Sequence, residues 1–86
     1  MKYTVATFYL FADLPDYKKK QPIIKEFCEK KSVFGTIILA PEGINGTISG
    51  ERKNIEDTLD FFRKDERLTH LPTRLSYTDR KSFHRM

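Results

Sequence analysis

Residues 34–50 read FGTIILAPEGINGTISG and carry the strongest structural signal in the chain. The first part, residues 34–40, is rich in β-branched and apolar side chains, which predicts a strand. Residues 41–46 supply turn-forming side chains, and the pair Asn45-Gly46 readily adopts two successive positive φ values. Residues 46–50 then predict a short return strand, so we expect a β-hairpin over this stretch.

A second apolar segment lies near the N-terminal end of the chain. Residues 3–11, YTVATFYLF, combine β-branched and aromatic side chains and predict a strand that is apolar on both faces. Such a strand is either central and covered on both sides, or covered on one side and open to a partner on the other. The segment ADLPD at 12–16 follows as a turn, because Pro and Asp favour turns.

One helix is expected between these two segments. Residues 17–32 place an apolar stripe along one side at helical spacing. Pro22 lies inside this segment, and proline disrupts a helix beyond its first turn. We therefore expect the main helix to begin near Gln21, after a short helical turn.

A second helix and a last strand follow the hairpin. Glu51 lies near the expected start of the helix, and the segment Asp65-Glu66-Arg67 ends it. Residues 73–78 alternate as a strand, with Leu75 and Tyr77 on the same side. The apolar positions that indicate the helix follow the spacing i, i+4, i+7: Ile55, Leu59 and Phe62.

The order of elements is therefore β-α-β-β-α-β, with strands near 3–11, 34–40, 46–50 and 73–78. This order predicts an α+β fold of the ferredoxin-like split βαβ type (βαββαβ), a four-stranded antiparallel sheet with two helices on one face. The other face is left bare by these 86 residues. Because the first strand is apolar on that side, we expect something outside this chain to cover it.

Length and charge narrow the classes of function. The 86 residues are enough for a single domain, 1–86. The formal net charge of +4 is low for a nucleic-acid-binding protein. The positive excess lies in two segments, 16–32 and 73–86. If the fold brings them together they form one basic patch, and otherwise they are two solvated faces.

Few side chains suggest catalysis or metal binding. Cys28 is the single cysteine, which excludes an internal disulfide and a Cys-based zinc site, and its place on the apolar stripe predicts a buried structural thiol. His70 and His84 lack the spacing of metal ligands. No apolar run is long enough to span a membrane. Three turn carboxylates are interpreted as solvated: Asp13, Asp16 and Glu42.

The fold class by itself suggests two functions, and the motifs support neither. The aromatic motif that RNA-recognition modules carry on their third strand is missing. An acylphosphatase holds its phosphate with an Arg in the first loop, whereas the loop ADLPD has no Arg and two acidic residues. The enzyme interpretation of these residues alone is therefore weak.

A more specific signal is a resemblance carried by four segments. The run Gly35–Gly50 matches a family signature nearly position by position, and the other segments agree with it: Tyr3–Phe11, Leu14–Tyr17 and Ser82–Met86. Over its whole length the chain resembles the N-terminal domain of the bacterial rhodanese-related tRNA uridine hydroxylases.

This resemblance implies an acylphosphatase-like, ferredoxin-type domain at one end of a two-domain enzyme. The family hydroxylates the wobble uridine of certain tRNAs, with molecular oxygen as co-substrate. Its reactive Cys lies in a rhodanese domain, which we expect C-terminal to this chain and therefore beyond Met86. The resemblance thus implies no catalytic residue within these residues, and we expect no metal or cofactor in them. A cytoplasmic location is the default expectation, because the chain has a single Cys and its first residues lack the features of a secretory signal.

Support of the catalytic domain and tRNA binding are the roles left for these residues. Basic side chains would contact RNA phosphates, and the candidates are Lys18, Lys19, Lys20, Arg74, Arg80, Lys81 and Arg85. A second hypothesis is a stand-alone binding module without catalysis. Such a module would engage a partner or a second copy through its bare sheet face or a basic patch.

Overall fold

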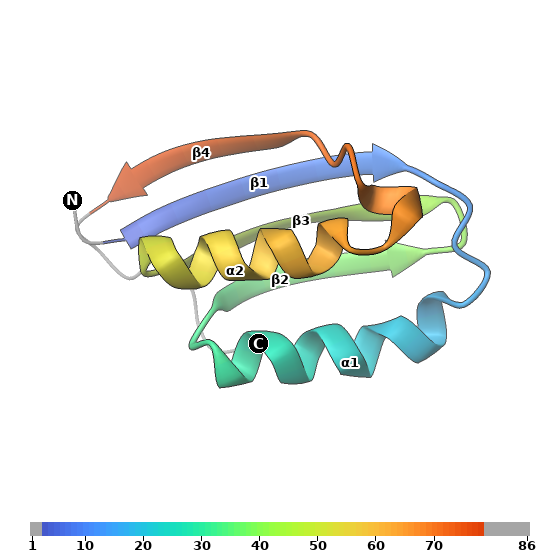
Figure 1. Cartoon of the computed structure of the whole chain (residues 1–86), viewed down its shortest axis with the longest axis horizontal. Coiled ribbons are helices and arrows are strands. Elements are labelled where there is room, and N and C mark those ends of the chain that lie inside the picture. The colour runs from blue at the N-terminus through green and yellow to red at the C-terminus, as the bar shows by residue number, and fades with distance from the viewer. Residues whose placement is uncertain (1–2, 79–86) are drawn as a thin grey trace.

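Strand β1 (Tyr3–Phe11) is one of the two central strands of the sheet, because both of its edges are paired. The computed structural model describes residues 3–78. The four strands are antiparallel and lie in the order β2-β3-β1-β4, so the predicted ferredoxin-like arrangement is confirmed (Figure 1). The remaining elements are α1 (Tyr17–Lys30), β2 (Phe34–Ala40), β3 (Gly43–Gly50), α2 (Arg52–Arg63), the 3₁₀ turn η1 (Glu66–Leu68) and β4 (Thr73–Thr78).

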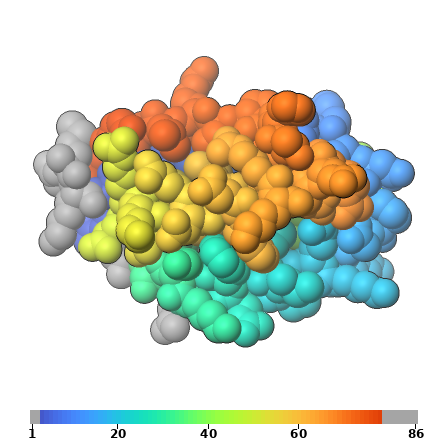
Figure 2. All heavy atoms as spheres, in the orientation of Figure 1, coloured from blue at the N-terminus to red at the C-terminus, as the bar shows by residue number. Residues whose placement is uncertain are grey.

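Both helices cover the same face of the sheet, with α1 against β2 and α2 against β1 and β3 (Figure 1). The core between them is held by aromatic contacts: the rings of Phe8 and Phe62 meet edge to face with centroids 5.4 Å apart. The helices also contact each other, since the rings of Phe27 and Phe61 stack in parallel at 4.1 Å. Figure 2 shows the result as one continuous layer formed by the two helices.

Helix α1 is continuous from Tyr17, so the prediction of a start near Gln21 is wrong. Pro22 lies inside the helix and is exposed. It removes one hydrogen bond, to the carbonyl of Lys18, and on the exposed side of the helix water can replace that donor. The buried side chains of Ile24 and Cys28 anchor the helix on its other side.

The hairpin turn lies at Pro41 and Glu42, so the predicted turn over residues 41–46 is too long, and Asn45-Gly46 is not part of it. Ala40 pairs with Gly43, and β3 begins there, three residues earlier than expected. The glycine at 43 is required by close packing, because a Cβ at this position would collide with the backbone of Leu10.

Gly46 lies within β3, where it faces the helices beneath the ring of Phe8. A Cβ at this position would lie 3.0 Å from Cζ of Phe8 and 2.6 Å from the carbonyl oxygen of Thr36. The absence of a side chain therefore makes room for the largest residue of β1 in the core. The other strand bounds agree with the prediction: 3–11, 34–40 and 73–78.

Candidate nucleic-acid interface

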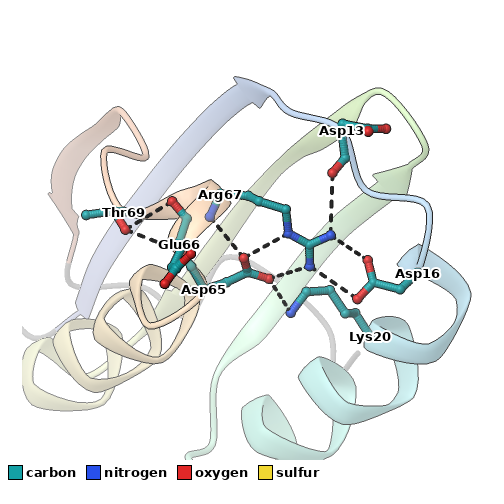
Figure 3. Close-up of polar contacts among 7 residues, drawn as sticks. All are labelled: Asp13, Asp16, Lys20, Asp65, Glu66, Arg67 and Thr69. Atoms are coloured by element: carbon teal, nitrogen blue, oxygen red, sulfur yellow. Dashed lines mark hydrogen bonds and ion pairs between the residues drawn. The ribbon is translucent and has the colours of Figure 1, made fainter.

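A cluster of four charged side chains, which we call the Arg67 cluster, joins the start of α1 to η1 (Figure 3). The guanidinium of Arg67 donates to both oxygens of Asp16 at 2.7 and 3.2 Å, and to both oxygens of Asp65 at 2.9 and 2.7 Å. The ammonium of Lys20 lies 2.8 Å from Oδ2 of Asp65. Two paired carboxylates thus hold both cations in fixed positions.

The electrostatics of the Arg67 cluster favour the charged form of every member. Hydrogen bonds from Arg67 lower the pKa of Asp65 and of Asp16 below the ordinary value of 3.8. The same bonds, first from Asp65 and then from Asp16, raise the pKa of Arg67. Neither carboxylate is available as a proton donor near neutral pH, so the cluster is structural. Asp16 is 42% exposed, but it is not only a solvated turn carboxylate, as the sequence predicts, because it pairs with Arg67.

The three consecutive lysines of α1 do not lie in equivalent surroundings. Lys20 belongs to the Arg67 cluster, and its side chain is only 24% exposed. Lys18 and Lys19 are exposed, and within the described part of the chain neither forms an ion pair. The ammonium of Lys18 lies 5.9 Å from the ring centroid of Tyr17. These two lysines are therefore free to bind phosphate, whereas Lys20 is already paired with Asp65.

The candidate Arg74 lies apart from these lysines. It is exposed on β4 and pairs with Thr7, whose side chain points away from the helices. The α1 lysines are in the helical layer, which covers the opposite face (Figure 1). Among the described residues the two basic segments therefore form two surfaces and not one patch. The other three candidates lie outside the described residues: Arg80, Lys81 and Arg85.

The face of the sheet that points away from both helices, which we call the open face, carries exposed aromatic side chains on its central strand. Tyr9 is 53% exposed and Phe11 is 70% exposed, and their rings meet edge to face at 5.0 Å. On β2 the open face adds Ile38, which is 54% exposed. No helix among residues 3–78 covers this face, as the sequence predicts.

Polar side chains fill the middle of the open face. Thr7 pairs with Thr47 and Thr47 with Thr36, so three hydroxyls form a row across β1, β3 and β2. The next row places Asn45 directly between Tyr9 and Ile38. These rows line a shallow hollow of about 490 Å³. Sequence reasoning found the apolar side chains of this face but not the polar rows, because these depend on the strand register.

Other candidate groups offer little chemistry. Cys28 is fully buried, and burial raises the pKa of its thiol to about 11, so the prediction of a structural thiol is confirmed. His70 is exposed, and His84 lies outside the described residues. Within residues 3–78, no three His, Cys, Asp or Glu side chains gather as a metal site would require. The helices in this range also lack the length and apolar character to cross a membrane.

Known proteins with similar sequences carry names that concern tRNA modification. The chain is 41% identical over 86 residues to the tRNA uridine(34) hydroxylase of Anaplasma marginale (strain Florida), covering 100% of this chain and 31% of that protein. It is 39% identical over 84 residues to the protein of the same name from Picosynechococcus sp., covering 98% of this chain and 28% of the relative. The chain thus spans about a third of the length of these curated relatives.

The chain is also similar to a plant protein and to a solved bacterial structure. Rhodanese-like domain-containing protein 7 of Arabidopsis thaliana is 49% identical over 67 residues, which cover 78% of this chain and 14% of that protein. A solved structure of a bacterial light-regulated adenylyl cyclase superposes with a TM-score of 0.69 over 93% of this chain and 25% of the other. At 14% sequence identity this second likeness concerns the fold alone.

The family model that matches is described as the UPF0176 acylphosphatase-like domain, and it covers residues 3–86. The match includes all elements of the sheet and both helices. Together with the similarity of the whole chain to the hydroxylases, it confirms the family that the sequence resembles. The chain therefore belongs to the UPF0176 acylphosphatase-like domain family.

Proposed function

We propose that this chain is the N-terminal domain of a tRNA uridine hydroxylase and that it helps to hold the tRNA. The observation that carries the proposal is the 41% identity over all 86 residues to a protein named tRNA uridine(34) hydroxylase. The hydroxylation of the wobble uridine would take place in a rhodanese domain C-terminal to these residues, with molecular oxygen as co-substrate. The whole protein would be located in the cytoplasm, where tRNA is modified.

The chemistry of the domain suits it to tRNA binding and not to catalysis. Its one cysteine, Cys28, is buried with a raised pKa, so it cannot supply a reactive thiolate. The domain can instead supply cations that bind the RNA backbone and position it for a catalytic site elsewhere. Lys18 and Lys19 suit this role, because both are exposed and neither forms an ion pair within the described part of the chain.

A double substitution tests the proposal in the protein extended to the length of its relatives. Lys18→Ala with Lys19→Ala should weaken tRNA binding and reduce the slope of log K against log salt by about 1.4 to 1.8, the value for two lost phosphate contacts. Lys20 is left unchanged, because its replacement would also break the ion pair with Asp65. Binding is measured by filter retention or fluorescence anisotropy over a range of salt concentrations.

A charge-matched control separates specific contacts from net charge. Lys30→Ala with Lys53→Ala also removes two positive charges, at the C-terminal end of α1 and the N-terminal end of α2 (Figure 1). Lys30 pairs with Glu26 at 3.3 Å, but both side chains are exposed, so the loss of this pair has little effect on stability. This control should leave the salt slope nearly unchanged. If the two double variants change tRNA affinity and the salt slope equally, Lys18 and Lys19 make no specific phosphate contact, and the proposed role is contradicted.

A further inference from the structure

We propose that the open face binds unpaired nucleotides of RNA, with bases stacked on Tyr9 and Phe11 and a phosphate held by Arg74. The inference rests on the proposed function, since it assigns a place on this domain to the single-stranded part of the tRNA. Sequence-specific proteins usually recognise RNA in loops, where unstacked bases are free to lie on aromatic side chains.

The two aromatic side chains have the exposure and rigidity that stacking requires. Tyr9 and Phe11 are 53% and 70% exposed, although both lie in a central strand of the sheet. Being two residues apart on one strand, they share a face and are separated by about 7 Å along it. Base stacking on such side chains is a sequence-tolerant source of affinity for single strands.

The polar row next to Tyr9 gives the face a way to recognise a base edge. Asn45 pairs with Tyr9 across the sheet and is exposed. Its amide carries one acceptor and two donors, so it can accept from N3–H of uracil and donate to a neighbouring carbonyl oxygen. The hydroxyls of Thr7, Thr36 and Thr47 line the same hollow of about 490 Å³. A base stacked on Tyr9 would therefore meet hydrogen-bonding groups at its edge.

The charge distribution sets the direction of the RNA backbone. Arg74 pairs with Thr7 and is thus the diagonal neighbour of Tyr9, at roughly 7–8 Å, within reach of a long side chain. By strand register, no Asp or Glu points to the open face among the described strands. The carboxylates of Asp13 and Glu42 lie beyond Phe11, around a hollow at the strand ends. The backbone should therefore run from Phe11 toward Arg74.

These features favour RNA over a protein partner. A protein-binding surface of this kind would present a continuous apolar patch, as the fully buried core of an interface does. Here the centre of the face is a row of hydroxyls and an amide. Its exposed aromatic groups, Tyr9 and Phe11, stand at one end, and the partly buried Tyr3 and Phe34 lie at the other. That arrangement matches stacked bases with polar edges more closely than it matches an apolar partner.

The test uses the absence of tryptophan from this chain, which makes an introduced Trp a unique fluorophore. Tyr9→Trp keeps a stacking ring on the open face, and Tyr77→Trp places one at a site of similar exposure, 49% against 53%, on the other face of β4. Titration with the heptaribonucleotide U₇ should quench Tyr9→Trp and leave Tyr77→Trp unchanged. Quenching of both to the same extent, or of neither, would overturn the inference.

A second set of variants measures the energetic contribution of each group. Tyr9→Ala should weaken binding of fluorescently labelled U₇ roughly 5- to 150-fold, the range for loss of one stacked base, whereas Tyr77→Ala should not. Arg74→Ala should lower the salt slope by about 0.7, the value for one phosphate on a single strand. Both Tyr positions are exposed, so circular dichroism should show unchanged folding. Unchanged U₇ affinity in folded Tyr9→Ala would overturn the inference.

The inference and the proposed function fail in different ways. If the Lys18 and Lys19 substitutions weaken tRNA binding but Tyr9→Ala does not, the proposed function stands and the stacking site is wrong. In the protein extended to the length of its relatives, the fluorescence that Tyr9→Trp adds to that of the unsubstituted protein should stay accessible to acrylamide until RNA is added. Shielding of this Trp before RNA is present would show that protein covers the open face, and would also overturn the inference.

Discussion

Asp65 is the carboxylate with the most partners in the Arg67 cluster. It binds Arg67 and Lys20, and it also accepts from the backbone N–H of Arg67 at 3.0 Å, which caps η1. We predict that Asp65→Asn lowers the free energy of unfolding by about 1–3 kcal/mol, because charge-assisted hydrogen bonds are lost while both cations remain. Urea denaturation of the two chains near neutral pH measures this difference.

The same variant gives a pH signature. The pKa of Asp65 is lowered in the folded chain, so the unfolded chain binds more protons as the pH falls below 3.8. The advantage of the wild type over Asp65→Asn should therefore be complete above about pH 5 and shrink progressively below about pH 4. Asp60→Asn, at an exposed position outside the cluster, is the control. A difference that grows on acidification would contradict the ion-pair account.

Spacing along the sequence could not reveal the Arg67 cluster. The sequence predicts that the segment 65–67 ends a helix, but the partner Asp16 lies 51 positions before Arg67. Only the fold brings the loop before α1 against η1. Lys20 could not be distinguished from Lys18 and Lys19 by sequence either. The three lysines are consecutive, and only the fold shows that Lys20 pairs with Asp65.

At the scale of elements, the packing of β3 against β1 depends on Gly46. We predict that Gly46→Ala lowers the free energy of unfolding by about 1–3 kcal/mol, because the added methyl group meets the ring of Phe8 and the carbonyl of Thr36. Gly50→Ala is the matched control, since its nearest contact would be 3.3 Å, to the carbonyl of Ser32. Equal losses for the two variants in urea denaturation would show that packing under Phe8 is not the cause.

The strands were predictable because their composition leaves few alternatives. Residues 3–11 and 34–40 are dense in β-branched and aromatic side chains, and their observed bounds are the predicted ones. The errors arose where a local preference competed with packing. Asn45-Gly46 favours a turn by itself, but the need for space beside Phe8 places Gly46 inside a strand. Pro22 disfavours a helix interior, but one exposed hydrogen bond is a small loss against the burial of Ile24 and Cys28.

At the scale of the whole molecule, binding and chemistry are expected to be separate. We predict that these 86 residues alone neither hydroxylate uridine nor transfer sulfur, because the thiol of Cys28 is buried with a pKa raised to about 11. Incubation with unmodified tRNA and oxygen, followed by nucleoside mass spectrometry, checks the first activity. The longer protein serves as the positive control. Modified uridine formed by this chain alone would contradict the prediction.

The position of β1 in the sheet also has a consequence for biosynthesis. Among the described elements this strand leaves the ribosome before the others, yet its two neighbours are β3 and β4, and β4 follows all the others in the described chain. Tyr3 pairs with Thr78, so β1 keeps one edge without a partner strand until almost the whole described chain has emerged. An unpaired strand edge is prone to pair with other chains. During synthesis one edge of β1 therefore stays exposed until β4 pairs with it.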